Sequence, residues 1–229
     1  MSNQEEIFET GPTFPFEDAS IVEQSVYETA YFHAKRAFEL SFLRDSINDV
    51  ISEREDWKYL ASHDQLTGVL NRHGLNESLR QIGQTNNLGC LVVDGTNVKA
   101  INDIYGHIVG DRAIEGMANV LTKSIRDEDI IARVGGDEFV IFFSLDARDD
   151  QGTNPEEQLD SLKTRIKQST EEFLLDNESF AVAGLEIAVG GSLPSIDITW
   201  EEMIQNAEED MTEHKSEQHL RVGQYRATS

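Results

Sequence analysis

The sequence predicts an α/β fold in which helices pack on a sheet, preceded by an N-terminal helical segment. Segments with the period of a helix alternate with short apolar, β-branched segments from about residue 61 to the C-terminus, as in domains built of helix and sheet layers. Hydrophobic residues make up 38% and charged residues 27% of the chain, an ordinary composition for a globular protein. We expect residues 1–60 to form a flexible lead-in and a helical segment, and residues 61–229 to form one domain.

The N-terminal part divides at about residue 20. Gly11, Pro12 and Pro15 predict an irregular start. No Pro or Gly occurs from Ile21 to Leu60, where apolar residues recur in steps of three and four at Tyr27, Tyr31, Ala34, Phe38, Leu43, Ile47 and Val50. This spacing predicts an apolar face on one long helix or on two packed helices. The face would serve either self-association or packing on the main domain.

The main domain is expected to contain four helices and five short strands. Periodic apolar positions predict helices over residues 72–84, 111–124, 156–175 and 200–215. Apolar and β-branched runs predict strands over residues 90–94, 130–134, 139–143, 180–190 and 220–225. The strands at 130–134 and 139–143 are joined by the tight turn Gly135–Glu138, which is typical of a β-hairpin.

The charge of the chain disfavours two classes of partner, and its single cysteine indicates no disulfide within the chain. The formal net charge of −24 disfavours binding to nucleic acid or to an anionic membrane surface. No apolar run approaches the roughly 20 residues that cross a bilayer, and the acidic N-terminus does not resemble a secretory signal. The single cysteine, Cys90, lies in an apolar run and is expected to be a buried thiol. We therefore expect a cytoplasmic protein with no nucleic-acid or membrane partner.

Acidic residues stand at two predicted strand ends. Asp94 ends the strand Leu91–Asp94 and is followed by Gly95, and the hairpin turn carries Asp137 and Glu138. Carboxylates from neighbouring strand ends often hold Mg²⁺, which prefers oxygen ligands and leaves room for substrate phosphates. Glycine allows the backbone to approach such phosphates closely.

These motifs resemble the GGDEF family of diguanylate cyclases. Gly135–Phe139 reads Gly-Gly-Asp-Glu-Phe, the family signature, and the opening motif is similar to Asp64–Arg72. The central motif is similar to Asp94–Asp103 and Tyr105–Asp111. The resemblance covers about residues 60–225. It implies a palm-like domain with a mixed, mainly antiparallel sheet flanked by helices, and a homodimer that joins two GTP molecules into cyclic di-GMP and releases pyrophosphate.

The resemblance also implies roles for single residues. Mg²⁺ or Mn²⁺ would be held by the side chains of Asp94 and Asp137 and by the carbonyl group of Gly95. Glu138 and Asp137 would be the catalytic residues, and Glu138 would help to deprotonate the attacking 3′-hydroxyl group. The remaining substrate-binding residues would be Asn102 and Asp111 for guanine and Lys99, Lys215, His219 and Arg133 for phosphates. Instead of a phosphate, Arg133 could support a partner residue of the protein. Asp64 and Arg72 are expected to pair with each other.

Simpler interpretations remain for several of these residues. Asn102 could cap or end a helix, and Asp111 could be the N-cap of the following helix. Arg126 and Asp129 match the inhibitory Arg-x-x-Asp site of the family, which binds cyclic di-GMP. In the alternative interpretation, Arg126 and Asp129 only belong to a charged connection between a helix and a strand.

The sequence departs from the family pattern at Thr96, Val98, Thr212 and His219. His219 stands where the family has an arginine, and a histidine is at most partly charged near neutral pH, so we expect weakened GTP binding. Two alternatives to a diguanylate cyclase therefore stay open. One is a non-catalytic effector that binds cyclic di-GMP and signals through its N-terminal helix, and the other is an enzyme that makes a different cyclic dinucleotide.

Overall fold

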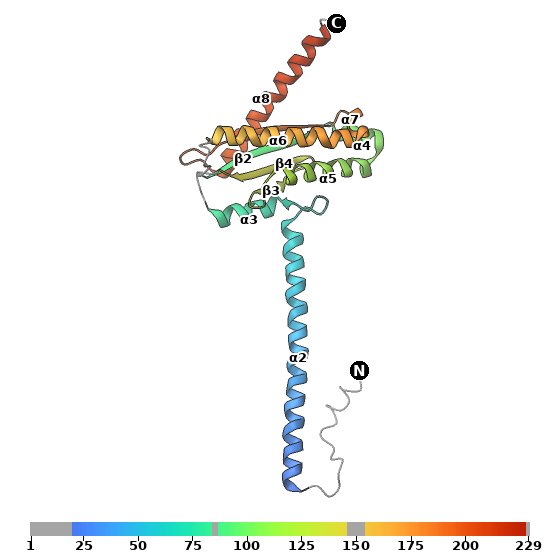
Figure 1. Cartoon of the computed structure of the whole chain (residues 1–229), viewed down its shortest axis with the longest axis vertical. Coiled ribbons are helices and arrows are strands. Elements are labelled where there is room, and N and C mark those ends of the chain that lie inside the picture. The colour runs from blue at the N-terminus through green and yellow to red at the C-terminus, as the bar shows by residue number, and fades with distance from the viewer. Residues whose placement is uncertain (1–19, 84–86, 146–153, 228–229) are drawn as a thin grey trace. The chain divides into compact units, whose positions relative to one another are not determined.

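The computed structural model describes residues 20–83, 87–145 and 154–227, with side chains of the last helix described up to Glu213. The chain forms two compact units, Met1–Lys58 and Tyr59–Ser229. Figure 1 shows the elements in order from α2 to α8. Within the described ranges, no helix combines the length and the apolar character needed to cross a membrane.

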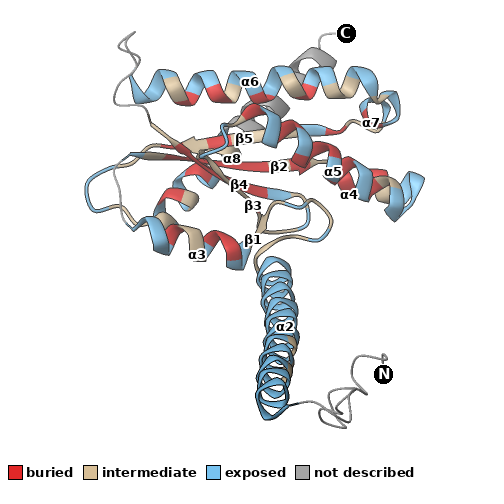
Figure 2. Cartoon of the chain, turned by 60° about the horizontal axis from the view of Figure 1, so that its bottom comes forward, coloured by how far each residue is buried: buried red, intermediate tan, exposed pale blue. Residues whose placement is uncertain are grey.

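Helix α2 (Ile21–Ser62) is one continuous helix, which decides between the two predicted arrangements of this segment. Its start is fixed by a capping box, in which Ser20 Oγ accepts from the Glu23 N–H at 3.4 Å and Glu23 Oε2 accepts from the Ser20 N–H at 2.8 Å. None of its residues is buried, and Figure 2 shows the helix almost entirely in the pale colour of exposed residues. Its apolar side chains are therefore largely exposed in the single chain.

The expectation that the apolar residues of α2 share one face is wrong. The steps of three and four stop at Phe38, and the next residue of the pattern, Leu43, is five positions away. At 3.6 residues per turn, five positions rotate the side chain by about 140° relative to the first stripe. The helix therefore carries two apolar stripes, residues 27–38 and residues 43–50, on nearly opposite sides.

The main domain is built on a five-stranded sheet with the order β1-β3-β4-β2-β5. The strands are β1 (Leu70–Asn71), β2 (Leu88–Thr96), β3 (Ile130–Arg133), β4 (Glu138–Ser144) and β5 (Glu186–Ser192). Only the β1–β3 pair is parallel, and the other three pairs are antiparallel. The predicted mixed, mainly antiparallel sheet is confirmed.

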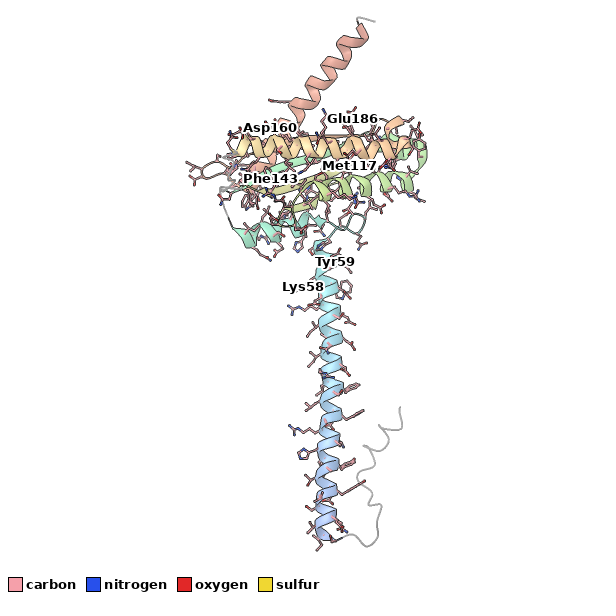
Figure 3. The ribbon with its side chains drawn as sticks, in the orientation of Figure 1. Lys58, Tyr59, Met117, Phe143, Asp160 and Glu186 are labelled. Atoms are coloured by element: carbon pink, nitrogen blue, oxygen red, sulfur yellow. The ribbon has the colours of Figure 1, made fainter. Side chains whose placement is uncertain are left out.

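Helices cover both faces of this sheet. They are α3 (Arg72–Ile82), α4 (Val98–Tyr105), α5 (His107–Ser124), α6 (Pro155–Asp176), α7 (Glu178–Val182) and α8 (Trp200–Ala227). Leu75 of α3 and Met203 of α8 share one core with Val92, whereas α4, α5 and α6 share the other core with Leu91. Met117 and Phe143, which are labelled in Figure 3, belong to this second core. We name the two sides the α3/α8 face and the α4/α5 face.

The structure differs from the sequence prediction in four elements. Strand β1 and helices α4 and α7 were not expected, and α7 occupies the start of the strand predicted at residues 180–190. The strand predicted at residues 220–225 is wrong, because α8 continues to Ala227 through a run with no Pro and with Gly223 as its only glycine. The predicted burial of Cys90 is confirmed, and this burial raises the pKa of its thiol far above the ordinary value.

Two adjacent glycines in β5 lie in close contact with α8 and α6. A Cβ atom on Gly190 would collide with the carbonyl oxygen of Ala207 in α8, and a Cβ on Gly191 would lie 2.6 Å from Leu159 of α6. Asp210 of α8 joins both elements to the strand, because its Oδ2 accepts from Lys163 Nζ at 2.7 Å and from the Gly191 N–H at 2.8 Å. The segment of α8 that leads to Lys215 is therefore held closely against the sheet.

Candidate active site

The two acidic strand ends are neighbours in the sheet. In the antiparallel β2–β4 pair, Asp94 lies directly opposite Glu138. The N–H of Gly95 donates to the carbonyl oxygen of Asp137 at 3.1 Å, which joins the two segments at the backbone. The two carboxylates and the Gly95 carbonyl are oxygen donors from adjacent chain segments, a donor set that suits Mg²⁺ or Mn²⁺.

Strand alternation places Asp94 and Glu138 on one face of the sheet. Cys90 and Val92 belong to the core of the α3/α8 face, so Asp94 continues the same side of β2. Val140 is in that core too, so Glu138 is on the same side of β4. Among the described residues, no cluster of three or more His, Cys, Asp or Glu side chains is arranged to hold a metal ion. A metal at Asp94 and Asp137 would therefore need further oxygen ligands, which substrate phosphates could supply.

The signature turn is closed by short-range contacts. The N–H of Val134 donates to the Glu138 carbonyl oxygen at 3.0 Å. A Cβ atom on Gly135 would collide with the carboxylate of Glu138, which therefore lies folded back against the turn. Glycine at this position leaves room for that carboxylate.

Asp64 and Arg72 do not pair with each other, contrary to the sequence prediction. Asp64 Oδ1 instead accepts from Arg133 Nη1 at 2.9 Å, and Arg72 Nη2 donates to the Val134 carbonyl oxygen at 2.9 Å. Both residues of the opening motif thus contact the hairpin across more than 60 positions of sequence. Local spacing could not reveal these partners.

The pKa of Asp64 is lowered. Partial burial alone would raise it, but hydrogen bonds from Thr67 and Arg133 and the charge of Arg133 outweigh burial. A carboxyl group whose pKa is lower in the folded than in the unfolded chain stabilises the fold above its unfolded pKa of about 3.9. That stabilisation disappears as the pH falls through the folded pKa.

We therefore expect Asp64→Asn to lower the urea midpoint of unfolding near neutral pH, and to lower it less at about pH 3. Urea titrations of both proteins at the two pH values measure this difference. An equal difference at both pH values would show that the carboxylate charge of Asp64 does not stabilise the fold.

The predicted guanine-binding residues lie on the α4/α5 face. Asn102 is partly buried in the second turn of α4, and Asp111 is exposed in the second turn of α5. Neither is a helix cap, since α4 is followed by Gly106 and α5 begins at His107, so the simpler interpretations of both are wrong. Lys99 is exposed in the first turn of α4. A nucleotide that contacted Asn102, Asp111 and Asp94 together would extend over the end of β2.

Two residues that support this region were missed by sequence reasoning. Asn97 adopts a left-handed conformation (φ 68°), and its Nδ2 donates to the Gly184 carbonyl oxygen at 2.7 Å, which fixes the loop between β2 and α4. Gly110 packs against Asn102, because a Cβ at Gly110 would collide with Asn102 Oδ1. No local signal marked Gly110, which precedes the helix predicted at residues 111–124.

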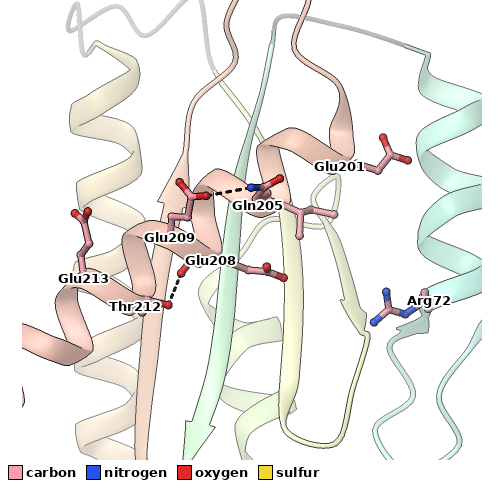
Figure 4. A pocket seen from close by; sticks show the side chains of 8 residues that line it. Arg72, Glu201, Gln205, Glu208, Glu209, Thr212 and Glu213 are labelled. Carbon is pink, nitrogen blue, oxygen red and sulfur yellow. Dashed lines mark hydrogen bonds between the residues drawn. The ribbon is translucent and has the colours of Figure 1, made fainter.

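A groove of about 900 Å³ lies between Arg72 and the exposed side of α8. Figure 4 shows its lining, in which Gln205 donates to Glu209 at 3.1 Å and Thr212 Oγ1 donates to the Glu208 carbonyl oxygen at 2.8 Å. The groove carries the carboxylates of Glu201, Glu208, Glu209 and Glu213. Lys215 and His219 lie further along α8, and their side chains are outside the described residues.

Comparison with known proteins identifies the domain. The profile of the family described as "Diguanylate cyclase, GGDEF domain" matches residues 61–221. The chain belongs to this GGDEF family. DgcT of Escherichia coli strain K12, a probable diguanylate cyclase, is 30% identical over 171 residues, which are 71% of this chain and 36% of DgcT. The chain therefore spans about a third of that relative's length.

Solved GGDEF structures share the fold. The coiled coil and GGDEF domain of DgcB from Caulobacter crescentus, solved with c-di-GMP, aligns with a TM-score of 0.59 at 18% identity and covers 79% of this chain and 94% of DgcB. The diguanylate cyclase SiaD of Pseudomonas aeruginosa, solved with its activator SiaC, aligns with a TM-score of 0.54 at 21% identity and covers 85% of this chain and 74% of SiaD. At these identities the likeness shows the fold.

In the GGDEF domain, Arg126 and Asp129 lie in the connection between α5 and β3. Asp129 has a structural role, because its two carboxylate oxygens accept from the backbone N–H groups of Arg126 and Ser144, each at 2.9 Å. The guanidinium group of Arg126 is half exposed and lies 4.0 Å from Glu128. The two residues of the predicted inhibitory site are therefore adjacent, with the arginine at the surface.

Proposed function

We propose that this chain is a diguanylate cyclase that condenses two GTP molecules into cyclic di-GMP. The observation that carries the proposal is the junction of β2 and β4, where Asp94 lies opposite Glu138 and Gly95 is bonded to Asp137 at 3.1 Å. This junction supports a site in which Asp94 and Asp137 are metal ligands and Glu138 is a separate base. GGDEF relatives that include diguanylate cyclases support the same reaction.

The reaction joins two half-sites. The 3′-hydroxyl oxygen of each GTP attacks the α-phosphorus of the other, two P–O bonds form, two α–β phosphoanhydride bonds break, and two pyrophosphates leave. Glu138 accepts the hydroxyl proton, and Asn102 and Asp111 orient guanine through amide and carboxylate contacts. Lys99, Lys215 and His219 bind phosphates. Mg²⁺ or Mn²⁺, held by Asp94, Asp137 and the Gly95 carbonyl, supplies charge compensation at the phosphate oxygens when bound.

The product assay tests this function. The purified chain is incubated with GTP and Mg²⁺ over a wide range of protein concentrations, and products are identified by chromatography and mass spectrometry. We expect cyclic di-GMP and pyrophosphate. If incubation with mixed nucleotides gave a different cyclic dinucleotide, the assigned product would change, and the chain would still be a dinucleotide cyclase.

The acid-lined groove favours one second candidate, a non-catalytic effector. Thr212 replaces a family tyrosine there, and the carboxylates of Glu208 and Glu209 repel a triphosphate that is not fully neutralised by metal. Absence of any product, together with measurable binding of cyclic di-GMP, would support this candidate and exclude the cyclase.

Catalysis by two half-sites requires a dimer, and α2 offers a surface for it. The second stripe, formed by Leu43, Ile47 and Val50, is 55%, 57% and 64% exposed. Their spacing of four and three residues is that of a coiled-coil seam. We propose that this stripe pairs with the same stripe of a second copy and raises the effective concentration of one GGDEF domain near the other.

Replacing Leu43, Ile47 and Val50 together by serine is expected to lower specific activity at nanomolar protein and to leave it nearly unchanged at high concentration, where encounters suffice. Sedimentation and product formation across a dilution series measure this. Phe42→Ser, at an exposed position beside the seam, is the control. Equal dilution behaviour of the triple variant and the wild type would remove the stripe from the dimer.

The Arg126 site is proposed to bind product and inhibit. Arg126→Ala is expected to weaken inhibition by cyclic di-GMP at least about tenfold, because a charged fork to phosphate or guanine is lost. Asp129 is not the residue to test, since it bonds the backbone at Ser144. Initial rates at increasing cyclic di-GMP measure the effect, and unaltered inhibition in Arg126→Ala would exclude this site.

A further inference from the structure

We propose that Arg133 is a positioning residue, which, anchored by Asp64, holds the carbonyl group of Gly136 and so fixes the turn that carries Asp137 and Glu138. This inference rests on the proposed function for its effect on catalysis. It assigns Arg133 to the protein turn instead of to a substrate phosphate.

The guanidinium group of Arg133 is committed to two protein acceptors. Its Nε and Nη2 atoms both donate to the Gly136 carbonyl oxygen, at 3.0 and 2.7 Å, and Nη1 donates to Asp64 Oδ1 at 2.9 Å. The side chain is only 14% exposed. This planar fork meets both acceptors at once, a geometry that the single ammonium group of lysine does not reproduce.

Strand register places Arg133 on the opposite face of the sheet from Asp94 and Glu138. Arg133 lies opposite Phe139, which belongs to the core of the α4/α5 face. Directly opposed residues of an antiparallel pair project from the same face, so Arg133 projects from the α4/α5 face. Glu138 and Asp94 project from the α3/α8 face. Arg133 therefore contacts the turn from the face opposite to Asp94 and Glu138, through the carbonyl group of Gly136, the residue before Asp137.

Asp64 is itself a fixed anchor. Its Oδ1 also accepts from the N–H of Thr67 at 3.0 Å and from Thr67 Oγ1 at 2.7 Å. Nearby, Asn71 Nδ2 donates to the carbonyl oxygens of Ala61 at 2.9 Å and His63 at 3.1 Å. Hydrogen bonds thus join Asn71 of the opening motif to the end of α2, and Asp64 of the same motif to Arg133 beside the signature turn.

Two variants separate positioning from phosphate binding. Arg133→Lys keeps the positive charge that a phosphate would need and loses the fork on Gly136. Asp64→Ala removes the anchor and leaves Arg133 in place. If Arg133 positions the turn, both variants raise the Mg²⁺ concentration for half-maximal activity by about tenfold or more, as loss of a supporting contact around a metal site does. Glu77→Ala, which breaks the exposed Arg80–Glu77 pair of α3, is the matched control.

A second readout does not depend on activity. Hydrogen–deuterium exchange of residues 133–139 is expected to rise in Arg133→Lys and Asp64→Ala and to stay at the wild-type level in Glu77→Ala. The double variant should exchange no faster than the more affected single variant, because both remove one linked contact.

The outcomes are distinguishable. Wild-type exchange and wild-type Mg²⁺ dependence in both variants would overturn the positioning role. A higher KM for GTP in Arg133→Lys, with normal Mg²⁺ dependence and a normal Asp64→Ala, would return Arg133 to phosphate binding. If the wild type forms no product, the proposed function fails, and the exchange measurement still decides whether Arg133 holds the turn.

Discussion

Asp137→Asn is expected to lower cyclic di-GMP formation by at least about 100-fold. The substitution keeps the shape of the side chain and removes the charge of one of two proposed metal ligands, and loss of even a supporting contact around a metal site costs about 10- to 100-fold. The turn should stay folded, because Arg133 bonds the backbone of Gly136 and not the Asp137 side chain.

Initial rates over a wide range of Mg²⁺ and Mn²⁺ concentrations measure this effect. Asp160→Asn is the control, since Asp160 is an exposed acid on α6 that is remote in sequence from both strand ends. Cyclic di-GMP formation by Asp137→Asn at more than a tenth of the wild-type rate would show that this carboxylate is not a required ligand.

Gly110→Ala is expected to lower kcat/KM for GTP by about 100-fold, since a small displacement of a substrate-positioning group has effects of this size. The added methyl group would displace Asn102 Oδ1, which the proposed function assigns to guanine. Most of the loss should appear as a higher KM, with unchanged Mg²⁺ dependence. The fold should tolerate the change, because alanine favours a helix interior by about 1 kcal/mol over glycine.

Steady-state kinetics and thermal unfolding of Gly110→Ala, measured together, test this expectation. Asn119→Ala, at an exposed position of the same helix, is the control. If Gly110→Ala unfolds at a lower temperature than the wild type, the loss of activity is due to disturbed packing. If it has the wild-type KM for GTP, Asn102 does not bind guanine.

The sequence predicted the parts of the fold and site that depend on local pattern. The acidic strand ends could be placed next to each other because each follows an apolar strand and the motifs match one family. The partner of Asp64 could not be predicted, since Arg133 and Arg72 are both cations within reach of a folded hairpin, and only the register of β3 selects Arg133. The five-residue step after Phe38 is visible in the sequence, but each half of α2 is regular by itself, and only the continuity of the helix turns this step into two separate stripes.

Helix α4 was missed for a different reason. It has only eight residues and follows Asn97, whose left-handed backbone interrupts the chain where a helix start signal would otherwise be sought. The strand predicted at residues 220–225 rested on a few apolar residues, and such short runs do not distinguish a strand from a continuing helix.

One glycine of β5 restricts how this domain can diverge. A side chain at Gly190 would require a shift of the α8 backbone, because its Cβ would collide with the carbonyl oxygen of Ala207. At Gly191 the nearest atoms are the ends of the Leu159 and Lys163 side chains, which can move without the helix. Because α8 also carries Lys215 and His219, replacement of Gly190 would relocate the groups proposed for the phosphates, so substrate binding is coupled to a residue on the opposite side of the α8–strand contact.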